Sequence, residues 1–348
     1  MKKTLDFQIE DSINCLNFIN PELAILFTTS GQILLYNTTT HTRINVMTNP
    51  GFRKYTCGNL DSSQPATIHV HDEIFVIAND FGDVARVVNI RKKYIYDFQR
   101  GDYQLQHCKY PIVLFNRKQK CYIGTTTAWN SMHIIDLQEI ENLFDANMGT
   151  DAMQQLPLDV NNDEYDYFWG QLSISSDNQY ILSRGWDWGS IDSLKVFDVE
   201  MYPNAPIEAE TRIGTMLEHL NRPACFIDKK NVAFLYREKE EGWIDVQSPT
   251  NQDEIHIYSH SGQFIEKITL DREVYSLESE MIYIDQQFVF YSSSHIQYYS
   301  KLGAHLSCTV INSNKIYSSI LHAIVSSLDQ SVTIYPIEYV NPNEITFE

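Results

Sequence analysis

One five-residue pattern returns seven times along the 348 residues of this chain: apolar, polar, apolar, aromatic or β-branched, then polar or proline. The copies are Ile33–Asn37, Ala85–Asn89, Met132–Asp136, Leu194–Asp198, Ile255–Ser259, Ile296–Ser300 and Val332–Pro336. Only Leu34 departs from the polar second position. Alternation with period two predicts a strand with one dry face, and the closing polar residue predicts its turn. Seven copies give about fifty residues per unit, the repeat length of a β-propeller blade.

The repeated pattern resembles the third strand of a WD-repeat blade, with Tyr, Phe, Ile or Val in place of Trp. The clearest match is the fourth unit, where Leu172–Ser183 reads as two strands joined by a tight Asp-Asn turn. The run Arg184–Gly189 resembles a Trp-x-Trp stretch in one blade of bacterial WD-repeat-like proteins without assigned activity. The resemblance implies an all-β, seven-bladed β-propeller of four-stranded antiparallel blades, and it carries over no catalytic residues.

The seventh unit lacks a fourth strand of its own, because residues 314–338 supply only three. Residues 4–10 contain Leu5, Phe7 and Ile9 in alternation with polar residues, as in a half-buried strand. We therefore expect a single domain, residues 1–348, whose ring of blades is closed by this N-terminal strand so that no blade lacks an edge.

The intervals between copies of the pattern are longest on either side of the fourth copy. Insertions are therefore expected around residues 137–170, 184–193 and 237–254. Within the first insertion, Ile140, Leu143 and Phe144 have helical spacing. This spacing predicts a short helix in place of, or before, the fourth strand of blade three.

The formal net charge is −19, with an isoelectric point near 4.9. Such a charge repels nucleic acid and anionic membranes and attracts basic partners, although it is also what solubility alone requires. The six cysteines are widely spaced without a CxxC pair, which argues against a zinc ribbon or a redox dithiol. No apolar segment suits a signal peptide or a membrane span. We expect a cytoplasmic monomer that binds neither nucleic acid nor membrane.

All five tryptophans are expected in loops that emerge on one face of the propeller. A tryptophan in a loop exposes a large apolar surface unless it covers something. Carboxylates accompany these rings, and aromatic faces framed by carboxylates suit Arg and Lys side chains. The candidate partner-binding residues are Trp129, Asp166, Trp169, Trp186, Asp187, Trp188, Glu240, Glu241 and Trp243. The alternative is that the rings pack on one another and cover the mouth of the propeller.

The sequence thus favours a non-catalytic binding module or scaffold, without a cofactor, that recognises a basic protein or peptide. An immunity protein against a cationic toxin is one concrete version. The alternative is a metal-dependent hydrolase or lyase that uses the central channel. His69 and His71 lie two apart on one strand and share a face, but the sequence fixes no carboxylate beside them. No GxSxG elbow, phosphate-binding glycine loop or HExxH motif occurs.

Overall fold

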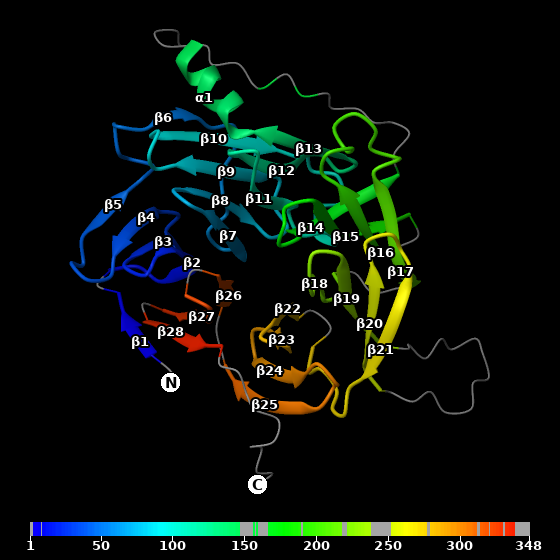
Figure 1. Cartoon of the computed structure of the whole chain (residues 1–348). Helices are drawn as coiled ribbons and strands as arrows, with labels where there is room; N and C mark the ends of the chain where they lie inside the picture. Colours follow the sequence, from blue (N-terminus) through cyan, green and yellow to red (C-terminus); the bar gives the residue numbers. More distant parts are fainter. Residues whose placement is uncertain are drawn as a thin grey trace. The chain divides into compact units, whose positions relative to one another are not determined.

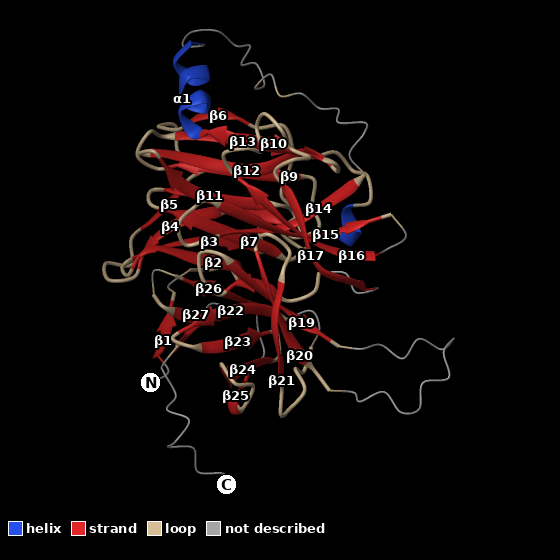
Figure 2. Cartoon of the chain, turned by 45° about the vertical axis from the view of Figure 1, so that its right-hand side comes forward, coloured by secondary structure: helices blue, strands red, loops and turns tan. Residues whose placement is uncertain are grey.

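The computed structural model describes residues 3–7, 9–146, 156, 158, 166–188, 191–217, 221–237, 252–276, 279–311, 314–319, 321–329 and 331–337. The described residues form 28 strands, one α-helix and one short 3₁₀ helix (Figure 2). The chain divides into two compact units. Unit one comprises Met1–Ile174, Gly185–Gly189 and Ser313–Ile337. Unit two comprises Ser175–Arg184, Ser190–Asn312 and Glu338–Glu348.

The strands form seven sheets, and each sheet is one blade, so the predicted seven-bladed β-propeller is confirmed (Figure 1). Blade one contains β2 (Ile13–Asn20), β3 (Leu23–Thr28), β4 (Ile33–Asn37) and β5 (Arg43–Asn45). Blade two contains β6 (Arg53–Tyr55), β7 (Ala66–His71), β8 (Ile74–Asn79), β9 (Val84–Asn89) and β10 (Tyr94–Gln99). Blade three contains β11 (Ile112–Arg117), β12 (Lys120–Ala128) and β13 (Ser131–Asp136), followed by α1 (Leu137–Ala146).

The later blades follow the same order along the chain. Blade four contains β14 (Tyr167–Ile174), β15 (Tyr180–Asp187), β16 (Ile191–Asp198) and β17 (Glu210–Leu217). Blade five contains β18 (Ala224–Phe226), β19 (Asn231–Tyr236), β20 (Glu254–Ser259) and β21 (Phe264–Thr269). Blade six contains β22 (Glu280–Ile284), β23 (Gln287–Tyr291), β24 (His295–Ser300) and β25 (His305–Val310). Blade seven contains β26 (Asn314–Ser318), β27 (Ala323–Leu328), β28 (Ser331–Pro336) and β1 (Lys3–Asp6).

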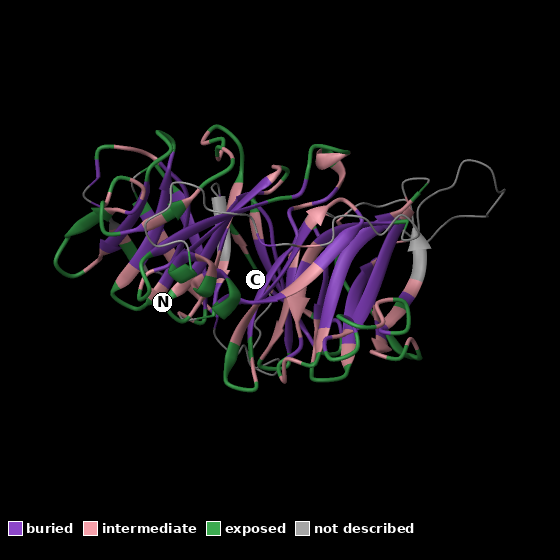
Figure 3. Ribbon diagram, turned by 90° about the horizontal axis from the view of Figure 1, so that it is seen from above, coloured by how far each residue is buried: buried purple, intermediate pink, exposed green. Residues whose placement is uncertain are grey.

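Each copy of the repeated pattern lies in the third strand of its blade, but these strands do not all have one dry and one wet face. In β9 all six residues are buried. The reason is packing on both sides: Val87 joins a hydrophobic cluster with Ile112 of blade three, and Val88 joins one with Ile25 of blade one. Figure 3 shows that buried residues lie along the strands and that exposed residues lie in the turns.

Burial on both faces puts the polar position of the pattern inside the molecule, where it needs a partner. Arg86 of β9 is 6% exposed and forms two hydrogen bonds of 2.8 Å to Asp97, one to each carboxylate oxygen. Lys195 of β16, 4% exposed, pairs with Glu210 at 2.9 Å. At these two positions the polar residue of the repeat is therefore buried and paired, whereas His133, His256 and Thr333 at the same position are only partly buried.

The N-terminal strand completes blade seven, as predicted. β1 pairs antiparallel with β28, and Leu5 lies opposite Val332. Beyond the strand, Phe7 and Ile9 are 3% and 5% exposed. Phe7 packs 4.7 Å from the ring of Tyr36 in blade one, measured between ring centroids. The segment therefore supplies an edge strand to blade seven and apolar side chains to the cluster shared with blade one.

Blades two and three depart from the four-strand plan at their outer edges. In blade two, β6 adds a fifth strand that runs parallel to β10, and Tyr55 stacks on Tyr96 with centroids 5.0 Å apart. In blade three, the described residues after β13 form α1, which confirms the predicted helix. Its buried residues are Leu137, Ile140 and Phe144.

Candidate functional site

Four of the five tryptophans lie in unit one. Trp129 lies in the turn between β12 and β13, and Trp188 lies in the turn after β15, as expected of loop residues. Trp169 and Trp186 instead lie inside β14 and β15, because the strands of blade four are longer than the repeated pattern indicates. The remaining predicted residues Glu240, Glu241 and Trp243 lie outside the described part of the chain.

The structure brings Trp129, Trp186 and Trp188 together with two residues that the sequence did not single out, Tyr103 and Phe168. We call these five residues the aromatic cluster. Phe168 is at its centre. Its ring centroid lies 3.8 Å from that of Trp186, 4.2 Å from Trp129, 5.3 Å from Trp188 and 5.9 Å from Tyr103.

The cluster has a buried inner layer and an accessible outer layer. Phe168 and Trp186 are 2% and 3% exposed. Tyr103 and Trp188 are 46% and 49% exposed, and Trp129 is partly buried. The inner rings therefore pack on one another, and the outer rings meet solvent.

The outer rings form a corner rather than a flat patch. The planes of Tyr103 and Trp129 lie within 32° of the plane of Phe168, at 25° and 32°. Trp188 stands at 83° to Phe168, at 73° to Trp129 and at 59° to Tyr103. The planes of Tyr103 and Trp129 are themselves inclined by 54°, so the three outer rings face in three directions, and we call these three rings the aromatic corner.

Strand alternation in β14 separates Phe168 from its neighbours. Tyr167 and Trp169 share the opposite face and pack edge to face, with centroids 5.2 Å apart. Trp169 is 1% exposed, and its backbone amide donates to the Trp129 carbonyl at 3.2 Å, which ties β14 to the turn of blade three. Gly185 of β15 permits the close approach, because a Cβ there would lie 2.2 Å from the Phe168 carbonyl oxygen.

Tyr103 is held by the loop that precedes the 3₁₀ helix η1 (Leu105–His107). Arg100 anchors this loop by donating to the carbonyls of Gly82 and Cys108 at 2.9 and 3.1 Å. Its guanidinium also lies over the ring of Tyr110, 4.8 Å from the centroid, and burial lowers the pKa of Arg100.

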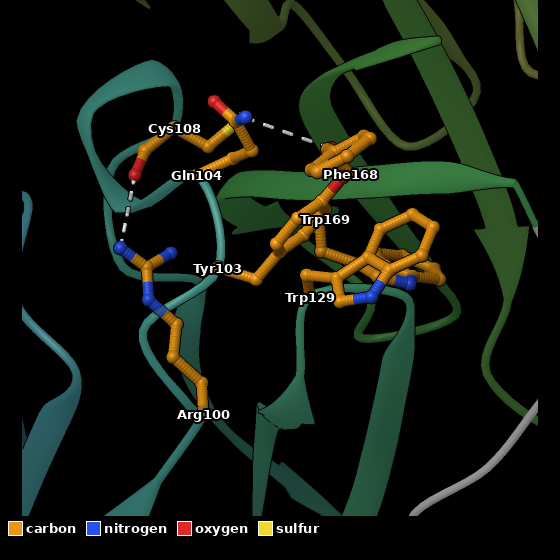
Figure 4. A pocket seen from close by; sticks show the side chains of 7 residues that line it. All are labelled: Arg100, Tyr103, Gln104, Cys108, Trp129, Phe168 and Trp169. Atoms are coloured by element: carbon orange, nitrogen blue, oxygen red, sulfur yellow. Dashed lines mark hydrogen bonds between the residues drawn. The ribbon is translucent and has the colours of Figure 1, made fainter. Parts of the chain in front are cut away.

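A small hollow lies beside the aromatic cluster. It is lined by Arg100, Tyr103, Gln104, Cys108, Trp129, Phe168 and Trp169. Figure 4 shows the guanidinium of Arg100 directed at the main chain of Cys108, with Trp129, Phe168 and Trp169 across the hollow. The guanidinium of Arg100 therefore makes hydrogen bonds within the fold, and the rings provide the accessible face.

Three of the four segments that supply rings to this cluster also supply a nearby carboxylate, and the turn of Trp129 does not. Asp102 precedes Tyr103, and Asp187 precedes Trp188. Asp166 lies two residues before Phe168. Asp102 and Asp166 are exposed, and Asp187 is partly buried. The predicted residues Asp166 and Asp187 thus lie on the same segments as the cluster, and Asp102 was missed by sequence reasoning.

The other missed residues had little signal in the sequence. Tyr103 lies in a polar connection with no strand pattern, and only the fold brings it beside residues of blade four. Phe168 belongs to the aromatic run at 167–169, where it is flanked by two larger rings. A search for consecutive aromatic residues at the start of a strand would have found it.

The described residues contain no group of three or more His, Cys, Asp or Glu side chains arranged to hold a metal ion. The predicted pair of histidines lies on β7. His71 faces the carboxylate of Asp72, with His71 Nε2 3.6 Å from Asp72 Oδ2. In the same part of the chain, no helix has both the length and the apolar character that a membrane crossing needs.

Unit two contains a buried charge pair that bears on pH dependence. Asp192 at the start of β16 is fully buried and accepts a 2.8 Å hydrogen bond from Arg222 Nε on Oδ2. Its other oxygen, Oδ1, has no hydrogen-bond partner. Burial raises the pKa of Asp192 to about 6, against the opposing effect of Arg222.

The sequence matches no family profile and no curated protein. Its fold, however, is similar to that of several solved structures. The Kuenenia stuttgartiensis hydrazine synthase gives a TM-score of 0.58 at 11% identity, covering 93% of this chain and 95% of that chain. U3-55K gives 0.53 at 10% identity, covering 97% and 98%. The Neurospora crassa Pan2 WD40 domain gives 0.50 at 9% identity, covering 97% of each chain. At this level of identity the likeness supports a WD-repeat-like fold and carries no activity.

Proposed function

We propose that this protein is a non-catalytic binding module that recognises a basic protein or peptide through the aromatic corner and its neighbouring carboxylates. The observation that carries the proposal is the exposure of Trp188 and Tyr103, 49% and 46%, on top of a buried aromatic layer. Two large rings in contact with water are unfavourable in free energy, and a partner that covers them removes this cost.

The electrostatics favour a cationic partner. Asp102, Asp166 and Asp187 lie on the segments that supply the rings, and the chain as a whole carries a formal charge of −19. A cation over an aromatic face gains from the ring quadrupole, and a carboxylate beside it adds an ion pair. Long-range attraction also raises the association rate of a basic partner.

The rigidity of the site supports the same function. The inner rings of Phe168 and Trp186 hold the outer rings, and Arg100 holds the loop of Tyr103. A surface that is already ordered loses less conformational entropy on binding. Trp169 and Trp186 would then act by supporting the surface, while Trp129 and Trp188 make the contacts.

A toxin-neutralising immunity protein is one concrete form of such a module, acting as a cytoplasmic monomer. It would mask a cationic toxin through this surface. The alternative of a metal-dependent hydrolase or lyase is favoured by no observation among the described residues.

The test is affinity capture from a lysate of the source organism, with bound proteins identified by mass spectrometry. Wild type is compared with a Tyr103→Ala/Trp188→Ala variant and with Phe81→Ala, which removes a ring that is 43% exposed in the turn between β8 and β9. We expect a basic protein that wild type and Phe81→Ala retain, that the double variant loses, and that about 0.3 M salt releases because screening weakens exposed ion pairs. Capture of the same proteins by all three, or of acidic proteins only, would contradict the proposal.

A further inference from the structure

We propose that the aromatic corner is selective for arginine over lysine side chains, so that its ligand is an arginine-bearing segment of the partner. This inference rests on the proposed function and specifies the chemistry of the same site. The observations behind it are the exposure of the rings, their separations and the carboxylates on the segments that supply two of them.

The corner is too closely packed to enclose a cation between its rings. The centroid separations are 5.7 Å for Tyr103 and Trp129, 6.3 Å for Tyr103 and Trp188, and 6.4 Å for Trp129 and Trp188. Rings this close are in contact with one another. A cation must therefore lie on the open face of one ring, with the neighbouring ring beside it.

An open ring face suits a guanidinium better than an ammonium. The planar guanidinium is weakly hydrated and can lie flat on a ring while its edge donates to a carboxylate. An ammonium is compact and strongly hydrated, and on an open face it keeps most of its water. Asp102, which is exposed, immediately precedes Tyr103, and Asp187, which is partly buried, immediately precedes Trp188, so each of these two segments also carries a carboxylate.

Among the described residues, three guanidinium groups of the protein itself lie over ring faces. Arg53 lies 5.2 Å above the centroid of Phe144, Arg100 lies 4.8 Å above Tyr110, and Arg222 lies 4.9 Å above Phe234. Arg53 and Arg222 also pair with a carboxylate, at 2.6 and 2.8 Å. A guanidinium that lies over a ring and also pairs with a carboxylate therefore occurs twice among the described residues of this fold, and we infer that a partner's arginine binds the aromatic corner in the same way.

The experiment titrates the full chain with hexa-arginine and hexa-lysine peptides, which carry equal charge, by isothermal titration calorimetry at fixed salt. We expect wild type to bind hexa-arginine about tenfold more tightly than hexa-lysine. Trp188→Leu should reduce that ratio to near one, because it removes the most exposed of the three rings. The matched control Phe81→Leu removes an exposed ring in the turn between β8 and β9 and should leave the ratio unchanged.

The outcomes separate this inference from the proposed function. If both peptides bind equally well and both weaken in Trp188→Leu, the corner binds basic ligands but does not select arginine, and the inference fails alone. If the ratio is the same in Trp188→Leu as in wild type, any selectivity lies elsewhere and the inference fails. If each peptide binds Trp188→Leu as tightly as it binds wild type, both the inference and the proposed function fail. Near-ultraviolet circular dichroism of each variant confirms that the fold is retained.

Discussion

The rings of Phe168 and Trp186 lie nearly parallel, with centroids 3.8 Å apart and planes inclined by 13°. One ring comes from β14 and the other from β15, so two adjacent strands of blade four supply the inner layer of the aromatic cluster. Trp186 and Trp188 therefore differ in role although they are two residues apart: Trp186 is part of the packing, and Trp188 is part of the surface.

This difference predicts that the same substitution has a large effect on stability at position 186 and a small one at position 188. Trp186→Leu should lower the free energy of unfolding by about 2 to 4 kcal/mol, because it leaves a cavity against Phe168. Trp188→Leu should change it by less than about 1 kcal/mol, because the side chain is half exposed. Urea-induced unfolding measures both. Equal losses at the two positions would show that the outer ring is as structural as the inner one.

Gly185 is required by space rather than by backbone conformation. A Cβ at this position would lie 2.2 Å from the Phe168 carbonyl oxygen and 2.5 Å from the Tyr167 ring. Gly185→Ala should therefore destabilise the protein by about 1 to 3 kcal/mol and weaken the near-ultraviolet circular dichroism of the aromatic cluster. Gly51→Ala is the matched control, since its nearest atom is a side-chain oxygen of Asn49 at 3.1 Å. If Gly185→Ala leaves the free energy of unfolding unchanged, β14 and β15 can move apart at this position without a loss of stability.

Deletion of residues 1–10 should cause unfolding or aggregation. It removes β1 and leaves the edge of β28 unpaired, and it also removes the buried side chains of Phe7 and Ile9. Size-exclusion chromatography and thermal melting detect the loss. Phe7→Ala separates the two causes, because it keeps the strand but should still cost about 3 to 5 kcal/mol through lost packing. A truncated chain that stays monomeric with an unchanged melting temperature would contradict the role of this strand.

Asp192 predicts a pH dependence with a defined sign. Its folded-state pKa, about 6, is above the ordinary value of 3.8, so the folded protein holds the proton more tightly than the unfolded chain does. The stabilising contribution of the protonated form is complete below pH 3.8 and is lost as the pH rises through 6. The loss is on the order of 3 kcal/mol.

Asp192→Asn removes this titration, although it also weakens the pairing of the buried Arg222. Thermal melting from pH 4.5 to 7.5 should show wild type losing stability relative to Asp192→Asn as the pH rises toward 6, with a constant difference above about pH 7. Parallel curves across this range would mean that Asp192 is already charged in the folded protein at low pH.

The sequence predicted the features that depend on local alternation. The third strands of all seven blades, the pairing of the N-terminal strand and helix α1 follow from the spacing of apolar residues, because each of these elements buries a face with a simple period. The burial of Arg86 and Lys195 was not predicted. Alternation within one strand does not reveal that a second blade covers the polar face.

The candidate site could be predicted only in part. The tryptophans and the aspartates beside them were visible as residue types, but which rings are exposed depends on how far β14 and β15 extend. Tyr103 belongs to the site through a contact with Trp188, 85 positions away along the chain (188 − 103), and no local pattern encodes that contact.

The pairing of β1 with β28 also sets a condition on biosynthesis. Lys3 lies opposite Ile334, which is 331 positions further along the chain (334 − 3). At a synthesis rate of about 5 to 20 residues per second, roughly 15 to 65 s pass between the emergence of the first strand and that of its partner. During that time the hydrogen-bonding groups of β1 must be satisfied by water or shielded by a chaperone. Blade seven, which begins to be made first, is the last blade that can be completed.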